Sequence, residues 1–166
     1  LGSSKQAMDD RVPSYYPPIP LGEPIAATTV GEVIESRSGS LEPGDLVVGL
    51  GGWQTHSTMP AESLVKIPEN NEFPIHYYLS ILGAVGLTPY FAIVEAGEAK
   101  AGQTMLMSTA AGAVGSIGGQ IGKILGLNVV GIAGTDEKCR WVTQDLGFDA
   151  CINYRTAGDM EVAIRN

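Results

Sequence analysis

Apolar and polar positions follow two different patterns along the chain, and the change lies near residue 70. Before it, short segments of alternating polarity are separated by turns rich in Gly and Pro, which is typical of half-buried antiparallel strands. The predicted strands are 28–36, 46–50, 53–59 and 64–67. They are few for a closed barrel, so we expect an open sheet or one that lacks partner strands.

After residue 74, apolar strands alternate with segments of helical period. The predicted helices are 75–82, 88–96, 114–125, 136–146 and 156–164, and the predicted strands are 104–108, 128–132 and 150–154. Pro89 is expected in the first turn of its helix, where Pro is tolerated, and Thr135 is expected to cap the helix that ends before Gly147. This alternation predicts about half of a doubly wound parallel sheet with right-handed crossovers.

A polar connector separates the two patterns. Its sequence is PENNEFP, residues 68–74, and it predicts a domain boundary between residues 72 and 73. The fold class expected is therefore α/β, with a β-domain over 1–72 and the first half of a nucleotide-binding domain over 73–166.

A turn of small residues between a predicted strand and a predicted helix carries the first functional signal. It reads Ala110-x-Gly112-x-x-Gly115, which is the G-x-G-x-x-G pattern with Ala at the first position. A helix N-terminus offers unpaired N–H groups and partial positive charge to a pyrophosphate, and small residues let it approach. Taken alone the pattern is weak, because a plain packed turn between a strand and a helix looks the same.

The end of the second parallel strand carries the next signal. An acidic residue there binds the adenosine ribose of NAD, but this chain has Ala133 at that place. Thr135, Lys138 and Tyr154 follow close by and suit a 2′-phosphate, which a carboxylate would repel. The sequence therefore favours NADP over NAD. Arg155 is interpreted as a solvated surface residue, an alternative that is weaker for Lys138.

Composition narrows the range of partners. The net charge is −8 and the isoelectric point is near 4.6, which argues against nucleic acid or an anionic membrane surface as a partner. The two cysteines, Cys139 and Cys151, are interpreted as buried thiols of a reducing, cytoplasmic compartment and not as a disulfide. No Cys spacing of the zinc-binding type is present, and no metal site is expected.

Several segments, in order, resemble the medium-chain dehydrogenases/reductases. They are LEPGDLV (41–47), LGAVGLTPYFAIVEAGEAKAGQT (82–104), STAAGAVGSIGGQIGK (108–123), VVGIAGTDEK (129–138) and LGFDACINYR (146–155). Together they are similar to the zinc-independent branch that includes prostaglandin reductases (leukotriene B4 12-hydroxydehydrogenases), alkenal reductases and curcumin-reductase-like enzymes. Where the zinc branch has a Gly-His-Glu segment, this chain has Ala26-Ala27-Thr28.

The resemblance implies a partial GroES-like β-domain and a partial Rossmann domain, with NADPH in the cleft between them. It implies hydride transfer to the C=C bond of an α,β-unsaturated ketone or aldehyde, a small-molecule substrate. By similarity, the pyrophosphate is held by Gly112, Ala113, Val114 and Gly115. The 2′-phosphate is held by Lys138 and Tyr154 with help from Thr135, and Thr88 lies near the nicotinamide.

Other features are left open by the sequence. Family members are about twice this length, so we expect the chain to be a part of a longer enzyme, which by resemblance forms homodimers. Tyr16 is a hypothesis for a substrate contact, with plain packing as the alternative. A zinc-free quinone oxidoreductase and a non-catalytic nucleotide-binding module are the competing functions. No catalytic residue is identified.

Overall fold

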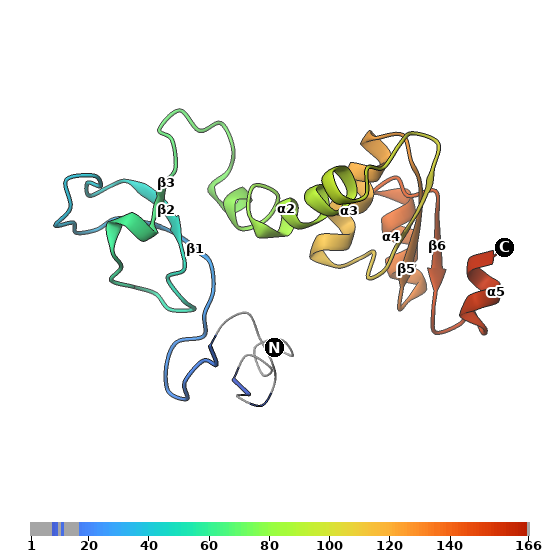
Figure 1. The fold of residues 1–166 in the computed structure, drawn as a ribbon, viewed down its shortest axis with the longest axis horizontal. Helices are drawn as coiled ribbons and strands as arrows, with labels where there is room; N and C mark the ends of the chain where they lie inside the picture. The colour runs from blue at the N-terminus through green and yellow to red at the C-terminus, as the bar shows by residue number, and fades with distance from the viewer. Residues whose placement is uncertain (1–7, 10, 12–16, 166) are drawn as a thin grey trace. The chain divides into compact units, whose positions relative to one another are not determined.

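The computed structural model describes residues 8–9, 11 and 17–165, and it divides the chain into two compact units, residues 1–79 and 80–166. The first unit holds an antiparallel sheet of order β1-β2-β3 (Figure 1). Its strands are β1 (Thr29–Glu32), β2 (Leu46–Gly49) and β3 (Val65–Lys66). A short 3₁₀ helix, η1 (Ala61–Ser63), lies between β2 and β3, and a second, η2 (Ile75–Leu79), follows β3. The apolar residues Leu41, Val47 and Ile67 are buried and form its small core.

The turn before β2 shows why its sequence is Pro-Gly-Asp. Gly44 has a φ of 95°, a left-handed conformation that favours Gly. The Asp45 carboxylate accepts the Glu42 N–H at 2.9 Å and contacts the Lys66 ammonium on β3 at 2.7 Å. The hydrogen bond from Lys66, with that from Glu42, holds the pKa of Asp45 below its ordinary value. One carboxylate therefore fixes the turn and joins it to the far edge of the sheet.

The predicted strand over 53–59 is wrong, and the other predicted strands of this unit are longer than the observed ones. The chain bends after Gly51, and Gly52 takes a φ of 77°. The Gln54 side-chain amide then donates to the Gly51 carbonyl at 2.7 Å. Such local bonds replace a strand ladder, so alternating polarity alone does not make a strand here.

The second unit holds a parallel sheet of order β4-β5-β6, and the predicted α/β class with an antiparallel and a parallel sheet is confirmed. Its strands are β4 (Thr104–Met107), β5 (Asn128–Ala133) and β6 (Ala150–Asn153). The crossovers contain α3 (Ala113–Ile124) and α4 (Asp136–Gln144), which lie on one side of the sheet (Figure 1), and α5 (Met160–Arg165) follows β6. The ends of these strands agree with the predicted ones to within one residue, and the predicted Thr135 cap is confirmed.

The fully buried positions of helix α3 are glycines, and its large apolar side chains, such as Ile121, are only partly buried. Its buried positions are Gly115, Gly118, Gly119 and Gly122, one face of the helix. Ile124, by contrast, is 84% exposed. A Cβ at Gly131 on β5 would lie 2.8 Å from the Ala110 Cβ, and one at Gly115 would lie 3.0 Å from the Ala110 Cα, so the β4–α3 turn lies close to both the strand and the first turn of α3.

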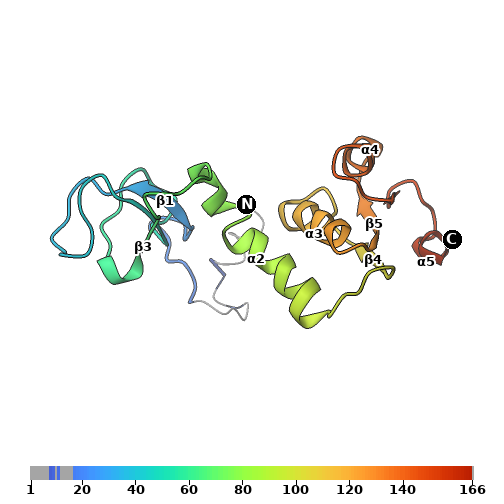
Figure 2. The same cartoon turned by 90° about the horizontal axis from the view of Figure 1, so that it is seen from above.

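The helical segment before β4 begins earlier than predicted. Helix α2 (Ala84–Tyr90) continues directly into a π-helical stretch, η3 (Phe91–Ala96), so Pro89 lies inside the helix and not in its first turn. Pro89 has no N–H and would crowd a regular ladder, which fits the change of helical period just after it. Pro89 is buried, and a Cβ at Gly118 of α3 would lie 3.0 Å from the Pro89 Cβ. Figure 2 shows α2 beside α3.

Candidate functional site

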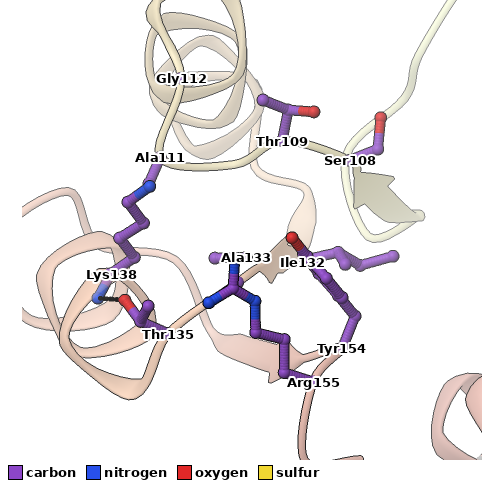
Figure 3. Close-up of a pocket in the computed structure, with 11 residues that line it drawn as sticks. Ser108, Thr109, Ala111, Gly112, Ile132, Ala133, Thr135, Lys138, Tyr154 and Arg155 are labelled. Atoms are coloured by element: carbon purple, nitrogen blue, oxygen red, sulfur yellow. Dashed lines mark hydrogen bonds between the residues drawn. The ribbon is translucent and has the colours of Figure 1, made fainter.

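A cavity of about 390 Å³ lies at the carboxyl ends of the parallel strands, where ligands bind in open α/β sheets. Its lining comes from the β4–α3 turn, the β5–α4 turn, helix α4 and the segment after β6 (Figure 3). The lining residues are Ser108, Thr109, Ala111, Gly112, Ile132, Ala133, Gly134, Thr135, Lys138, Tyr154 and Arg155. Within the described residues this lining has two cationic side chains, four hydroxyls and no carboxylate.

The β4–α3 turn lines one side of the cavity. The Ala110 N–H donates to the Ile132 carbonyl at 3.0 Å, which ties the turn to β5, and Thr109 takes a φ of 51°. The Gly112 N–H turns back to the Thr109 carbonyl at 2.8 Å, and Gly112 caps α3 without a side-chain bond. The first N–H groups of α3 have no acceptor within the helix, so this end favours an anion.

Helix α4 positions a hydroxyl and an ammonium. The Lys138 N–H donates to Thr135 Oγ1 at 3.2 Å, which is the side-chain cap that the sequence predicts. A hydroxyl that accepts one bond keeps its own proton for another acceptor, so Thr135 can still donate into the cavity. The Lys138 side chain extends from α4 toward Ala111 in Figure 3.

Tyr154 directly follows β6, and its ring lies against Gly134, the residue after β5. Its N–H donates to the Ala133 carbonyl at 3.1 Å, which prolongs the sheet by one bond. A Cβ at Gly134 would lie 2.8 Å from the Tyr154 hydroxyl oxygen, so the absence of a side chain at residue 134 makes room for the phenol. Ala133 itself is 4% exposed and small, so β5 places no carboxylate at the strand end.

Asn153 joins the two segments that carry these side chains. Its amide nitrogen donates to Asp136 Oδ1 at 2.6 Å, and its amide oxygen accepts the Arg155 N–H at 3.1 Å. The Asp136 carboxylate therefore accepts a hydrogen bond from Asn153, and Asp136 does not line the cavity.

Arg155 is the residue that the sequence interpretation missed. It lines the cavity together with Lys138, and its guanidinium carbon lies 5.9 Å from the centre of the Tyr154 ring. Within the described part of the chain it makes no ion pair with a carboxylate. The signal available in the sequence was its place two residues after the end of a parallel strand, at the binding edge of the sheet.

Only some of the predicted site residues converge on the cavity. Gly112, Thr135, Lys138 and Tyr154 line it, whereas Ala113, Val114 and Gly115 follow as the first residues of α3. Thr88 lies within α2, and its hydroxyl donates to the Ala84 carbonyl at 2.7 Å. Tyr16 lies outside the described residues.

The interpretation of Cys139 and Cys151 as free thiols is wrong. The structure pairs them as a disulfide between α4 and β6, with the two Cα atoms 5.2 Å apart. Cys151 on β6 is paired in the sheet with Gly131 on β5. The disulfide joins the same two elements as the Asp136–Asn153 bond.

Two further kinds of feature are absent from the described residues. They contain no group of three or more His, Cys, Asp or Glu side chains placed to hold a metal ion. They also contain no helix that is long and apolar enough to cross a membrane.

Known proteins are similar to this chain in sequence and in fold. Residues 4–67 match a family described as the N-terminal domain of oxidoreductase. The NADPH-dependent curcumin reductase of Escherichia coli is 40% identical over 142 residues, 86% of this chain and 41% of that protein. The NADP(+)-dependent 2-alkenal reductase of Nicotiana tabacum is 39% identical over 153 residues, 92% of this chain and 44% of that protein.

Solved structures give the same result. CurA from Vibrio vulnificus in complex with NADPH superimposes with a TM-score of 0.85 at 33% identity, over 98% of this chain and 48% of that one. The Escherichia coli quinone oxidoreductase complexed with NADPH gives a TM-score of 0.71 at 26% identity, over 90% of this chain and 46% of that one. The chain thus spans less than half the length of each of these relatives.

Proposed function

Because the chain belongs to the zinc-independent branch of the medium-chain dehydrogenases/reductases, we propose that it carries the adenosine half of the NADPH site of a double-bond reductase. The observation that carries the proposal is the cavity at the ends of β4–β6. Its lining combines Lys138, Tyr154 and Thr135 with a strand end, Ala133, that bears no acid. Relatives named as NADP-dependent reductases support it.

The donors present fit a phosphorylated adenosine ribose. Lys138 supplies charge to a 2′-phosphate, while the Tyr154 and Thr135 hydroxyls supply hydrogen bonds. The Tyr154 ring lies against Gly134, and no carboxylate lines the cavity there. Thr88, whose hydroxyl is bonded within α2, is assigned to the nicotinamide end by resemblance alone.

The pyrophosphate is assigned to the start of α3. Ala113, Val114 and Gly115 would hold it through backbone N–H groups and the helix dipole, while Gly112, whose N–H donates to the Thr109 carbonyl, would contribute the open space left by its missing side chain. The small side chains of Gly112 and Ala113 leave the backbone open to phosphate oxygens. Bound NADPH would supply the hydride that reduces the C=C bond of an α,β-unsaturated ketone or aldehyde, a small-molecule substrate.

The cofactor assignment is tested by titrating the full-length protein with NADPH and with NADH and following tryptophan fluorescence. We expect NADPH to bind more tightly by at least about 100-fold, the value of one to two charge-assisted contacts. NADH binding as tightly as NADPH would refute the assignment.

The reaction is tested by following NADPH absorbance in the presence of a simple enone, a quinone and a secondary alcohol with NADP⁺. Consumption of NADPH with the enone and formation of the saturated ketone is the expected result. A quinone oxidoreductase is the second candidate, because the chain superimposes on the quinone oxidoreductase of Escherichia coli. Turnover of the quinone and not of the enone would select it, and binding without turnover of either would favour a non-catalytic module. The homodimer and the cytoplasmic location stay predictions.

A further inference from the structure

We propose that Arg155 is a second cationic contact for the 2′-phosphate, and that it sets the preference for a 2′-phosphorylated ribose jointly with Lys138. This inference rests on the proposed function, because it concerns the same cavity. It assigns a role to a residue that the sequence alone places on a solvated surface. Three observations on the described residues carry it.

The first observation is position. Arg155 and Lys138 approach the cavity from different elements, Lys138 from α4 and Arg155 from the segment after β6. Figure 3 shows the Arg155 guanidinium between Thr135 and Tyr154, inside the ring of lining residues and not pointing away from it. A phosphate held from two sides by separate cations is constrained in place as well as in charge.

The second observation is that the backbone and side chain of Arg155 are both held. The Arg155 N–H donates to Asn153 Oδ1 at 3.1 Å, and the guanidinium carbon lies 5.9 Å from the Tyr154 ring centre, within cation–π range. The Asn153 amide also donates to Asp136 Oδ1, so the strand end that carries Arg155 is bonded to the helix that carries Lys138. The two backbone segments that carry the cations are therefore joined through Asn153.

The third observation is charge. Five side-chain ion pairs join described residues, and neither Arg155 nor Lys138 takes part in any of them. The protein carries a net charge of −8, yet the residues that line this cavity include two cations and no carboxylate. A phosphate dianion is the ligand chemistry that matches this lining.

The test compares adenosine 2′,5′-bisphosphate, adenosine 3′,5′-bisphosphate and 5′-AMP by isothermal titration calorimetry on the full-length protein. The first two ligands have the same charge and differ only in the position of one phosphate. Arg155→Gln is the test variant, and Arg155→Lys keeps the positive charge but not the paired N–H donors of the guanidinium. Arg140→Gln is the matched control. Arg140 lies on α4 two residues beyond Lys138 and does not line the cavity.

We expect Arg155→Gln to weaken 2′,5′-bisphosphate binding by about 10-fold and to leave 5′-AMP binding unchanged within about twofold. Arg155→Lys should recover part of the loss, and Arg140→Gln should change no ligand by more than about twofold because it alters only the distant field. Equal losses for the 2′ and 3′ isomers would overturn the contact, since they would indicate general attraction. Unchanged 2′,5′-bisphosphate binding in Arg155→Gln would overturn it as well.

The same measurement separates this inference from the proposed function. If the unaltered protein binds 2′,5′-bisphosphate no better than 5′-AMP, the NADPH assignment fails for Lys138 and Arg155 alike. If it prefers 2′,5′-bisphosphate and Arg155→Gln retains the full preference, only the role of Arg155 fails. The melting temperature of each variant without ligand should match that of the parent, because the Arg155 side chain is exposed.

Discussion

At the scale of single residues, the cavity depends on places where a side chain is absent. Gly134 admits the Tyr154 phenol, and Gly115 lets the first turn of α3 close onto the β4–α3 turn. A Cβ at Gly115 would contact the Thr109 carbonyl oxygen and would lie 3.0 Å from the Ala110 Cα. Backbone atoms cannot move aside as the end of a flexible side chain can.

Gly115→Ala is therefore expected to lower the free energy of unfolding by about 1–3 kcal/mol through overpacking and to weaken nucleotide binding through displacement of the turn. Gly39→Ala is the control, since a Cβ there meets nothing within 4 Å. Urea denaturation of both variants measures the effect. Equal stability of Gly115→Ala and Gly39→Ala would contradict the close approach described above.

Asp149 is a second residue whose contribution is specific. Its carboxylate accepts the Lys123 ammonium at 2.7 and 2.8 Å and the Val129 N–H at 2.6 Å, so it joins α3, β5 and the segment before β6. The hydrogen bond from Lys123, with that from Val129, holds the pKa of Asp149 below its ordinary value of 3.8. A lowered pKa stabilises the folded state above that value, and this stabilisation is lost as the pH falls below 3.8.

Asp149→Asn should thus reduce the melting temperature at neutral pH, and the difference from the parent should shrink as the pH falls from 5 toward 3. Thermal melts across that range, followed by circular dichroism, measure it. Asp159→Asn serves as the control, because Asp159 is exposed and receives only backbone bonds from the start of α5. A difference that grows toward acid would refute the assignment.

At the scale of elements, α4 and β6 are joined twice, by the Cys139–Cys151 disulfide and by Asp136–Asn153. The chain has two cysteines, so titration of the denatured protein with a thiol reagent should find none free before reduction and two after it. Replacing both by Ser should cost about 3 kcal/mol of unfolding free energy, the value expected for a short closed loop.

Reductant provides the control for this prediction. It should lower the melting temperature of the parent and leave that of the double Ser variant unchanged. Two reactive thiols in the unreduced, denatured parent would show that the disulfide does not form.

Parts of the element plan are readable from the sequence for identifiable reasons. Thr135 and Gly147 bracket α4 because a cap and a left-handed glycine act locally. The strand predicted over 53–59 fails because Gly52 redirects the chain, and the disulfide was missed because it depends on how β6 lies beside β5. Arg155 was missed because its position depends on the turn after β6, which periodicity does not describe.

At the scale of the whole molecule, every residue that lines the cavity belongs to the unit formed by residues 80–166. The predicted boundary at 72/73 stays a prediction, but the exposed segment that contains it offers Glu69 and Glu72 to a glutamate-specific protease. Limited cleavage there should leave the affinity for adenosine 2′,5′-bisphosphate within about twofold, because no lining residue is lost.

The protease experiment needs a comparison site. Cleavage of the same protein after Glu161, in α5, should also preserve binding, whereas a cut after Glu137, beside Lys138, should abolish it. Loss of binding on cleavage at Glu72 would mean that residues before it contribute to the adenosine site.

The glycine face of α3 has a kinetic consequence. Each glycine costs a helix roughly 1 kcal/mol relative to alanine, so the buried four make α3 negligibly helical in the unfolded chain. The helix dipole and the aligned N–H groups at the start of α3 therefore form only when the helix packs against the sheet. An anion that binds this end recognises the assembled βαβ unit and nothing earlier on the folding pathway, so adding it should slow unfolding without accelerating folding.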